Sequence, residues 1–107
     1  ASWCVPCVQE LPFLKSLYQT YHEDGLNIVS VSLDTKKSAW EAAVKKHQIP
    51  WPQISDLKGW KGTITKDYAI SAIPFILVID RKGKIAVRNL HDYKLENAIK
   101  EIFSTKN

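Results

Sequence analysis

Two cysteines, Cys4 and Cys7, are the residues whose type and spacing point most directly to chemistry. They are the only cysteines of the chain, and Val5 and Pro6 separate them. Two thiols at this spacing, at the start of a helix, can close and reopen a short disulfide, because the second lies about one turn beyond the first. A single pair of this kind is more typical of a redox motif than of a disulfide framework.

The helix behind the motif is expected to set the reactivity of Cys4. A cysteine at a helix N-terminus lies near unpaired N–H groups and the positive end of the helix dipole, and both stabilise a thiolate. In such motifs the pKa of the thiol falls from about 8.5 to roughly 3.5–7.5. We therefore expect Cys4 to be the exposed thiol that attacks a partner disulfide. Cys7, one turn deeper, is expected to attack the mixed disulfide and release the partner.

Two other uses of the pair fit the sequence less well. A zinc site needs about four ligands, but there is no third cysteine, and His22, His47 and His91 are far apart in the chain. A structural disulfide across so short a loop would do little to constrain the unfolded chain. We therefore expect a redox-active disulfide that needs neither a metal nor an organic cofactor.

The composition is that of one ordinary globular domain. The chain has 107 residues, of which 45% are hydrophobic and 24% charged, and its net charge is +4. Acidic residues lie among the lysines, as in Lys94-Leu95-Glu96, which indicates a solvated basic surface and no nucleic-acid partner. No segment approaches the length of a membrane span.

Hydrophobic periodicity predicts the elements that position the cysteines. The helix behind the motif should carry Leu11, Leu14, Tyr18 and Tyr21 on one face. The predicted order is helix, strand, helix, short helix, strand, strand, helix, which indicates an α/β layered domain. The corresponding residues are 5–22, 27–33, 36–47, 63–68, 74–80, 85–90 and a last helix from 92 onward.

Three tryptophans outside the motif have separate expected roles. Trp40 repeats with the apolar residues of its helix and is expected in the core. Trp51 and Trp60 fall in predicted loops, where they either form a partner surface or pack locally. Local packing is the more consistent of the two.

Several segments together resemble the thioredoxin superfamily, in particular the TlpA/ResA-like branch of extracytoplasmic thiol–disulfide oxidoreductases. Trp3-Cys4-Val5-Pro6-Cys7 matches the Trp-Cys-x-x-Cys motif of that family, and Pro12 matches its helix-kinking proline. Ile73-Pro74 precedes an apolar strand, as the cis-proline segment of the family does. The turn at residues 80–84 and the final amphipathic helix complete the resemblance.

The resemblance implies roles for four residues besides the cysteines. Pro74 would pack beside the two cysteines in the cis form, and the backbone of Ile73 would pair with an extended substrate segment. Trp3 would shape the groove for the partner. Glu10 would lie near the thiols, where a carboxylate can raise the pKa of Cys7 or relay its proton. The alternative for Glu10 is a solvent-facing side chain favoured by the helix dipole.

The family also places a central strand immediately before the catalytic turn, whereas only three residues precede Cys4. Residues 1–107 are therefore expected to form a single thioredoxin-like domain that is incomplete at its N-terminus. Without that strand, backbone groups inside the sheet would lack partners.

These observations favour a thiol–disulfide oxidoreductase that exchanges disulfides with protein partners and takes electrons from a partner dithiol. The resemblance implies a periplasmic or envelope location. Two alternatives remain: a peroxiredoxin-like thiol peroxidase, against which the close second cysteine argues, and a redox-inert binding or chaperone-like module. The direction of exchange stays open, because reductases, oxidases and isomerases share this motif.

Overall fold

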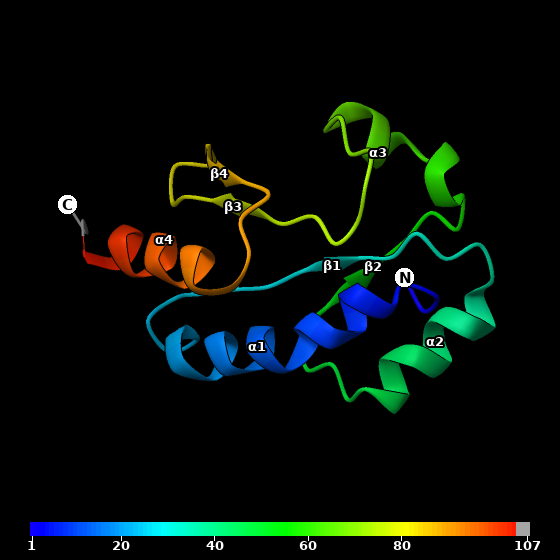
Figure 1. Cartoon of the computed structure of the whole chain (residues 1–107), viewed down its shortest axis with the longest axis horizontal. Coiled ribbons are helices and arrows are strands. Elements are labelled where there is room, and N and C mark those ends of the chain that lie inside the picture. Colours follow the sequence, from blue (N-terminus) through cyan, green and yellow to red (C-terminus); the bar gives the residue numbers. More distant parts are fainter. Residues whose placement is uncertain (105–107) are drawn as a thin grey trace. The chain divides into compact units, whose positions relative to one another are not determined.

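The computed structural model describes residues 1–104, which fall into two compact units. The first unit is Ala1–Ile73, and the second starts at Pro74. The first contains three α-helices (α1, α2 and α3), the 3-10 helix η1 and the strands β1 and β2 (Figure 1). The second contains β3, β4 and α4, and each unit has its own two-stranded sheet.

Helix α1 (Val5–Tyr21) begins directly after Cys4, as the sequence predicts. Pro6 lies in the first turn, where the missing N–H of proline leaves no hydrogen bond unmade. The helix continues through Pro12. Leu17 is the buried residue of this helix and is 3% exposed, so α1 is anchored in the core behind the cysteine motif.

Strands β1 (Ser30–Val31) and β2 (Gln53–Ile54) form a parallel pair. The N–H groups of Ser30 and Ser32 donate to carbonyls of the β2 segment at 3.1 and 2.9 Å. In a parallel pair, alternate residues of a strand bond to the same neighbour. The backbone groups of Val31 therefore point to the other edge of β1, where no strand of residues 1–104 pairs.

The sequence pattern does not predict the extent of these two strands correctly. It predicted a strand over residues 27–33, but only Ser30–Val31 is paired, because the partner segment is itself two residues long. It predicted no strand at β2. The segment between Pro50 and Ser55 is short and interrupted by prolines, so β2 has no periodic pattern and forms only because β1 lies beside it.

Trp51 packs as expected. It is 3% exposed, its indole N–H donates to Ser30 Oγ at 2.6 Å, and its ring centroid lies 5.4 Å from that of Tyr18. One side chain therefore ties the β2 segment to both β1 and α1.

Trp60 does not pack as expected, because it is 46% exposed. It lies in η1 (Gly59–Lys61), a single turn in which Gly59 is buried. A side-chain carbon at Gly59 would lie 3.2 Å from Thr35 Cγ2, so this turn rests on Thr35 through the glycine. Trp60, the next residue, is left on the outside.

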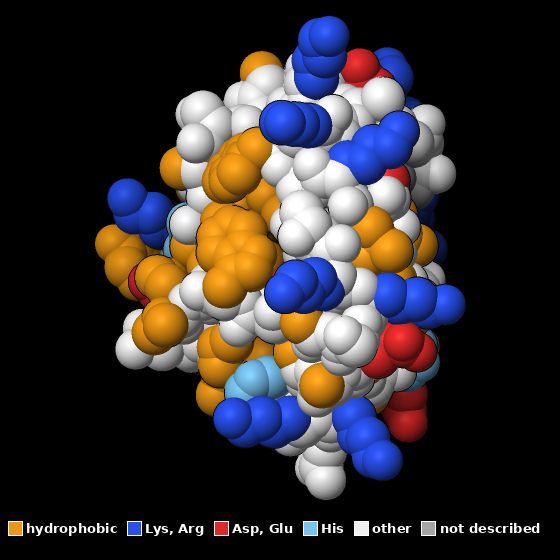
Figure 2. Space-filling view, turned by 90° about the vertical axis from the view of Figure 1, so that its right-hand side faces the viewer, with side chains coloured by type: hydrophobic (Ala, Val, Ile, Leu, Met, Phe, Trp, Pro, Cys, Tyr) orange, Lys and Arg blue, Asp and Glu red, His pale blue; other side chains and the backbone are white. Residues whose placement is uncertain are grey.

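Helices α2 (Lys37–Lys46) and α3 (Thr63–Asp67) agree with the sequence prediction. In α2, Trp40 and Val44 are half-buried while the lysines are exposed, which is the amphipathic pattern of a helix on a surface. Figure 2 shows the side of the molecule that carries α2 and η1, where exposed hydrophobic side chains lie beside lysine or arginine side chains.

The second unit begins with a hairpin and ends with a helix. Strands β3 (Leu77–Ile79) and β4 (Ile85–Arg88) are antiparallel, as predicted, but shorter than predicted. Helix α4 (Asp92–Ser104) buries Leu95 and Ile99, which are 1% and 5% exposed and lie four residues apart on one face.

Helices alternate with short parallel and antiparallel strands, so the α/β class is confirmed. None of the helices within residues 1–104 is long and apolar enough to cross a membrane.

Candidate functional site

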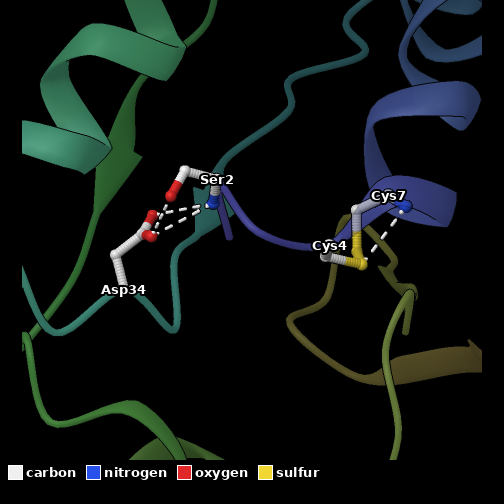
Figure 3. Close-up of a disulfide and its surroundings, with 4 residues drawn as sticks. All are labelled: Ser2, Cys4, Cys7 and Asp34. Carbon is white, nitrogen blue, oxygen red and sulfur yellow. Dashed lines mark hydrogen bonds between the residues drawn. A yellow bond between two sulfur atoms is a disulfide. The ribbon is translucent and has the colours of Figure 1, made fainter.

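Cys4 and Cys7 form the expected disulfide across the first turn of α1. Their Cα atoms are 5.2 Å apart. Cys4 is the N-cap residue of the helix, with an extended backbone (φ −92°, ψ 97°). The Cys7 N–H donates to Cys4 Sγ at 3.2 Å (Figure 3). The sulfur of Cys4 therefore occupies the place at the helix N-terminus where an N-cap side chain accepts a hydrogen bond.

The expectation that Cys4 is exposed is wrong for the disulfide form. Cys4 is only 5% exposed, whereas Cys7 is half-buried. The sulfur of Cys4 is bonded to Cys7 Sγ and accepts the Cys7 N–H. The exposed residues around it are Trp3 and Val5, at 53% and 64%.

Glu10 lies on α1, three residues after Cys7, and is half-buried. Ile73 and Pro74 lie in the segment between α3 and β3 and are also half-buried. Ile73 ends the first unit and Pro74 begins the second. Their expected contacts with the cysteines and with a substrate stay predictions, as does the cis form of Pro74.

A buried carboxylate, which the sequence analysis did not identify, holds the segment that leads into the motif. Asp34 is 2% exposed and accepts the Ser2 N–H at 2.9 Å and the Ser2 hydroxyl (Figure 3). It also accepts the Ser32 hydroxyl at 2.6 Å, while its own N–H donates to Ser32 Oγ at 3.0 Å. Ser2 is thereby fixed two residues before Cys4.

Two opposing effects act on the pKa of Asp34. Burial alone raises the pKa of this carboxyl, but hydrogen bonds from the side chains of Ser2 and Ser32 and from the Ser2 N–H lower it, and together they prevail. The pKa of Asp34 is therefore below its ordinary value, and the residue is a carboxylate at neutral pH.

One signal in the sequence could have identified Asp34. It is the first charged residue after the apolar stretch that contains β1. Binding and catalytic groups of α/β proteins gather beyond the carboxyl ends of parallel strands. Its contact with Ser2, 32 residues away, could not be read from local spacing.

The arrangement is suited to disulfide exchange. It offers a disulfide at a helix N-terminus and exposed apolar residues on either side of Cys4. The segment before Cys4 is held by the hydrogen bonds of Ser2 to Asp34. Within residues 1–104, no group of three or more histidine, cysteine or acidic side chains is placed to hold a metal ion.

Known proteins are similar to this chain in sequence and in fold. The chain is 34% identical over 84 residues to the thiol-disulfide oxidoreductase ResA of Bacillus thuringiensis subsp. konkukian, which covers 78% of this chain and 47% of that protein. It is 32% identical over 87 residues to the sporulation thiol-disulfide oxidoreductase A of Bacillus subtilis, with 78% of this chain and 51% of that protein covered. The chain thus spans about half the length of the curated relatives it matches.

A solved thiol-disulfide oxidoreductase from Bacteroides fragilis superposes with a TM-score of 0.88 at 33% identity. The superposition covers 94% of this chain and 74% of that structure. The profile of the family described as thioredoxin-like matches residues 1–85, which include the cysteine motif and Ile73-Pro74. The resemblance inferred from the motifs is therefore confirmed, and the chain belongs to the thioredoxin-like family.

Proposed function

We propose that this domain is a thiol–disulfide oxidoreductase that exchanges disulfides with protein partners through Cys4 and Cys7. The observation that carries the proposal is the disulfide at the N-terminus of α1, with the Cys7 N–H donating to Cys4 Sγ at 3.2 Å. When the disulfide opens, the same N–H is available to the Cys4 thiolate and favours its ionised, nucleophilic form. The names of the relatives support this reaction class.

The exchange takes two displacements. A substrate thiolate attacks Cys4 Sγ, the bond to Cys7 breaks, and Cys7 leaves as a thiolate. The second substrate thiolate then attacks the substrate sulfur of the mixed disulfide, which releases Cys4. Two electrons pass from the substrate dithiol to the disulfide of the domain, and the two protons lost by the substrate are balanced by those that Cys4 and Cys7 gain. Run in reverse, Cys4 attacks a substrate disulfide and Cys7 resolves it.

Four further residues are proposed to assist. The exposed Trp3 would contact the substrate beside Cys4, and the backbone of Ile73, next to Pro74, would pair with an extended substrate segment. Glu10 would exchange a proton with Cys7. The exposure of Trp3 and the half-buried position of Glu10 one turn beyond Cys7 support these roles.

Serine variants of the two cysteines test the reaction and the order of attack. In an insulin-reduction assay with an excess of dithiothreitol, both Cys4→Ser and Cys7→Ser should lose the catalysed rate. When the pre-reduced variants are mixed with insulin in the absence of dithiothreitol, only Cys7→Ser should accumulate a mixed disulfide with the substrate, because it keeps the attacking thiol but has no resolving thiol. Non-reducing electrophoresis measures that species.

Retention of activity by both serine variants would refute the proposal. Peroxide consumption by the reduced domain that is faster than its disulfide exchange would favour a thiol peroxidase instead. A disulfide that no dithiol can reduce would favour a redox-inert binding module.

Two further expectations concern the natural setting of the domain. We propose a periplasmic or envelope location, supported by the resemblance to an extracytoplasmic branch and tested by cell fractionation. We also propose that the complete domain has another strand beside the free edge of β1. The edge of β1 at which no strand within residues 1–104 pairs and the greater length of the relatives support that strand. A structure of the natural protein with no strand at that edge would exclude it.

A further inference from the structure

Lysines are concentrated in the middle of the first unit. Residues 36–66 contain seven lysines and only two acidic residues, Glu41 and Asp56. Four of these lysines, at the start of α2 and around η1, are exposed and are here called the basic ridge. The basic ridge consists of Lys36, Lys37, Lys58 and Lys61.

Packing at Gly59 brings the two halves of the basic ridge together. A side-chain carbon there would lie 3.2 Å from Thr35 Cγ2 and 3.4 Å from the carbonyl oxygen of Leu33. Thus η1 lies against the segment that leads directly into Lys36 and α2. Lysines more than twenty residues apart in the chain therefore share one part of the surface. Figure 2 shows this side of the molecule, with positive side chains beside exposed hydrophobic ones.

A hydrogen bond links the segment that leads into the basic ridge to the segment that leads into the cysteine motif. Asp34, two residues before Lys36, accepts the Ser2 N–H at 2.9 Å, and Ser2 is two residues before Cys4 (Figure 3). The same buried contact that positions the motif thus anchors the start of the ridge. The positive charge of the ridge thus begins two residues beyond the carboxylate that holds the segment before Cys4.

Exposed apolar side chains accompany this charge. Trp60 lies between Lys58 and Lys61 and is 46% exposed, and Trp3 next to Cys4 is 53% exposed. Aromatic side chains are enriched in protein recognition surfaces. Charge near a binding site accelerates the encounter with an oppositely charged partner, and salt weakens this effect.

We propose that the basic ridge selects protein substrates whose reactive cysteines are flanked by acidic residues. The inference rests on the proposed function, because it assigns a substrate class to the same cysteine pair. An anionic membrane is the other surface that such a ridge could bind. The protein substrate is favoured because the Ser2–Asp34 hydrogen bonds connect the start of the ridge to the motif that is proposed to react with thiols of proteins.

The test uses two synthetic dithiol peptides that are identical except for acidic or basic residues around their cysteines. Stopped-flow fluorescence measures the second-order rate at which each reduces the oxidised domain. At low ionic strength the acidic peptide should react about tenfold faster than the basic one, and the advantage should shrink as salt shortens the screening length.

Charge reversal assigns the preference to the ridge. The double variant K58E/K61E should lower the rate for the acidic peptide about tenfold and raise the rate for the basic peptide. The matched control K45E/K46E makes the same charge change in the last turn of α2, at the other end of that helix from Lys37, and should have a much smaller effect at physiological salt. The milder variant K58Q/K61Q should give an intermediate loss, which keeps the test valid if charge reversal perturbs folding.

Reaction with dithiothreitol, a neutral dithiol, separates failure of this inference from failure of the proposed function. Equal rates for the two peptides, with normal reduction by dithiothreitol, would overturn the ridge proposal and leave the reaction intact. No reaction with any dithiol would overturn the proposed function. A third outcome is that the domain binds phosphatidylserine vesicles, that K58E/K61E abolishes this binding, and that the peptide rates are unchanged. That outcome would also overturn the proposal and assign the ridge to a membrane surface.

Discussion

At the scale of single residues, Asp34 is the residue outside the cysteine pair on which the structure around the motif depends most. Its carboxylate is 2% exposed and accepts hydrogen bonds from the Ser2 N–H and from the hydroxyls of Ser2 and Ser32. A buried charge is tolerated only when it is fully hydrogen-bonded. Asp34 therefore stabilises the fold only while it remains ionised and Ser2 stays in place.

Asp34→Asn should lower the free energy of unfolding by about 1–2 kcal/mol at pH 7, because hydrogen bonds to a charged acceptor are replaced by weaker ones. The pKa of Asp34 is lowered in the folded state from its ordinary value of 3.8. The contribution of the charge is therefore complete above about pH 4 and is lost as the pH falls through the folded pKa. Urea unfolding of both proteins from pH 7 to about pH 3 measures this difference.

The matched control is Asp67→Asn, at an exposed aspartate in the last turn of α3. It should change stability by less than about 0.5 kcal/mol. If Asp34→Asn lowers the free energy of unfolding by the same amount from pH 7 to pH 3, the shape of the Asp34 side chain, and not its charge, explains its effect on stability.

Glu10→Gln tests the proposed proton exchange with Cys7. If the Glu10 carboxylate opposes ionisation of Cys7, its removal should let Cys7 titrate at lower pH, because a like charge disfavours a thiolate. The pH dependence of alkylation in Cys4→Ser, with and without Glu10→Gln, measures the change at Cys7 alone. Glu23→Gln, at an exposed glutamate just after α1, is the control. If Cys7 titrates identically in Cys4→Ser and in both double variants, Glu10 has no role in the ionisation of Cys7.

At the scale of elements, short strands depend on side chains from outside themselves. The β1–β2 pair has two residues in each strand, far fewer than an independently stable sheet needs. Trp51 supplies the additional connection through its indole N–H to Ser30 Oγ. The hairpin of β3 and β4 depends instead on its turn, in which Asp80 Oδ1 accepts the N–H groups of Lys82 and Lys84.

Trp51→Phe and Ser30→Ala should each lower the free energy of unfolding by about 1 kcal/mol, and the double variant should lose less than the sum, because both remove the same hydrogen bond. Urea unfolding of the four proteins gives the coupling energy. Trp40→Phe is the matched control, since Trp40 Nε1 is buried without a partner within residues 1–104. Strict additivity of the two losses would show that the bond does not connect the strands.

Gly83→Ala should destabilise the hairpin unit by about 1 kcal/mol. Gly83 has φ +79°, and nothing lies within 4 Å of the position that a side-chain carbon would take, so backbone strain is the only cost. Gly83→Asn should cost less, because asparagine tolerates the left-handed region better than alanine. Thermal unfolding compares the two variants, and equal losses would exclude backbone strain as the cause.

At the scale of the whole molecule, the first unit leaves apolar surface and one sheet edge open. Val29, Val31 and Ile54 are 56%, 39% and 49% exposed, and no strand of residues 1–104 pairs with the free edge of β1. An unpaired edge with apolar side chains is a template for pairing with another chain. This surface is where the proposed additional strand would pair.

We therefore expect residues 1–107, prepared by themselves, to associate as the concentration rises. Val31→Lys should suppress the association, because a charge on an edge strand blocks pairing between edges. Sedimentation velocity over a range of concentrations measures it. Ala42→Lys, at an exposed position on α2, adds the same charge away from the edge and should leave association unchanged. A monomer at all concentrations would show that the edge is protected without a further strand.

The sequence by itself determined the features that depend on neighbours in the chain. Spacing placed Cys4 and Cys7 one turn apart at a helix N-terminus, periodicity predicted α1, α2, α3 and α4, and the turn at Gly83 predicted the hairpin. Each is a local preference that operates within one or two turns of backbone. The motifs around the cysteines and Ile73-Pro74 also sufficed to identify the family.

Only the tertiary structure decided the features that depend on distant partners. The pairing of β2 with β1 spans more than twenty residues, and the contact of Asp34 with Ser2 spans 32. Burial of Cys4 and the gathering of the basic ridge around Gly59 likewise depend on packing between elements. Residue type shows what such a side chain can bind, but the folded chain determines which partner lies within reach, because long-range contacts leave no periodic pattern in the sequence.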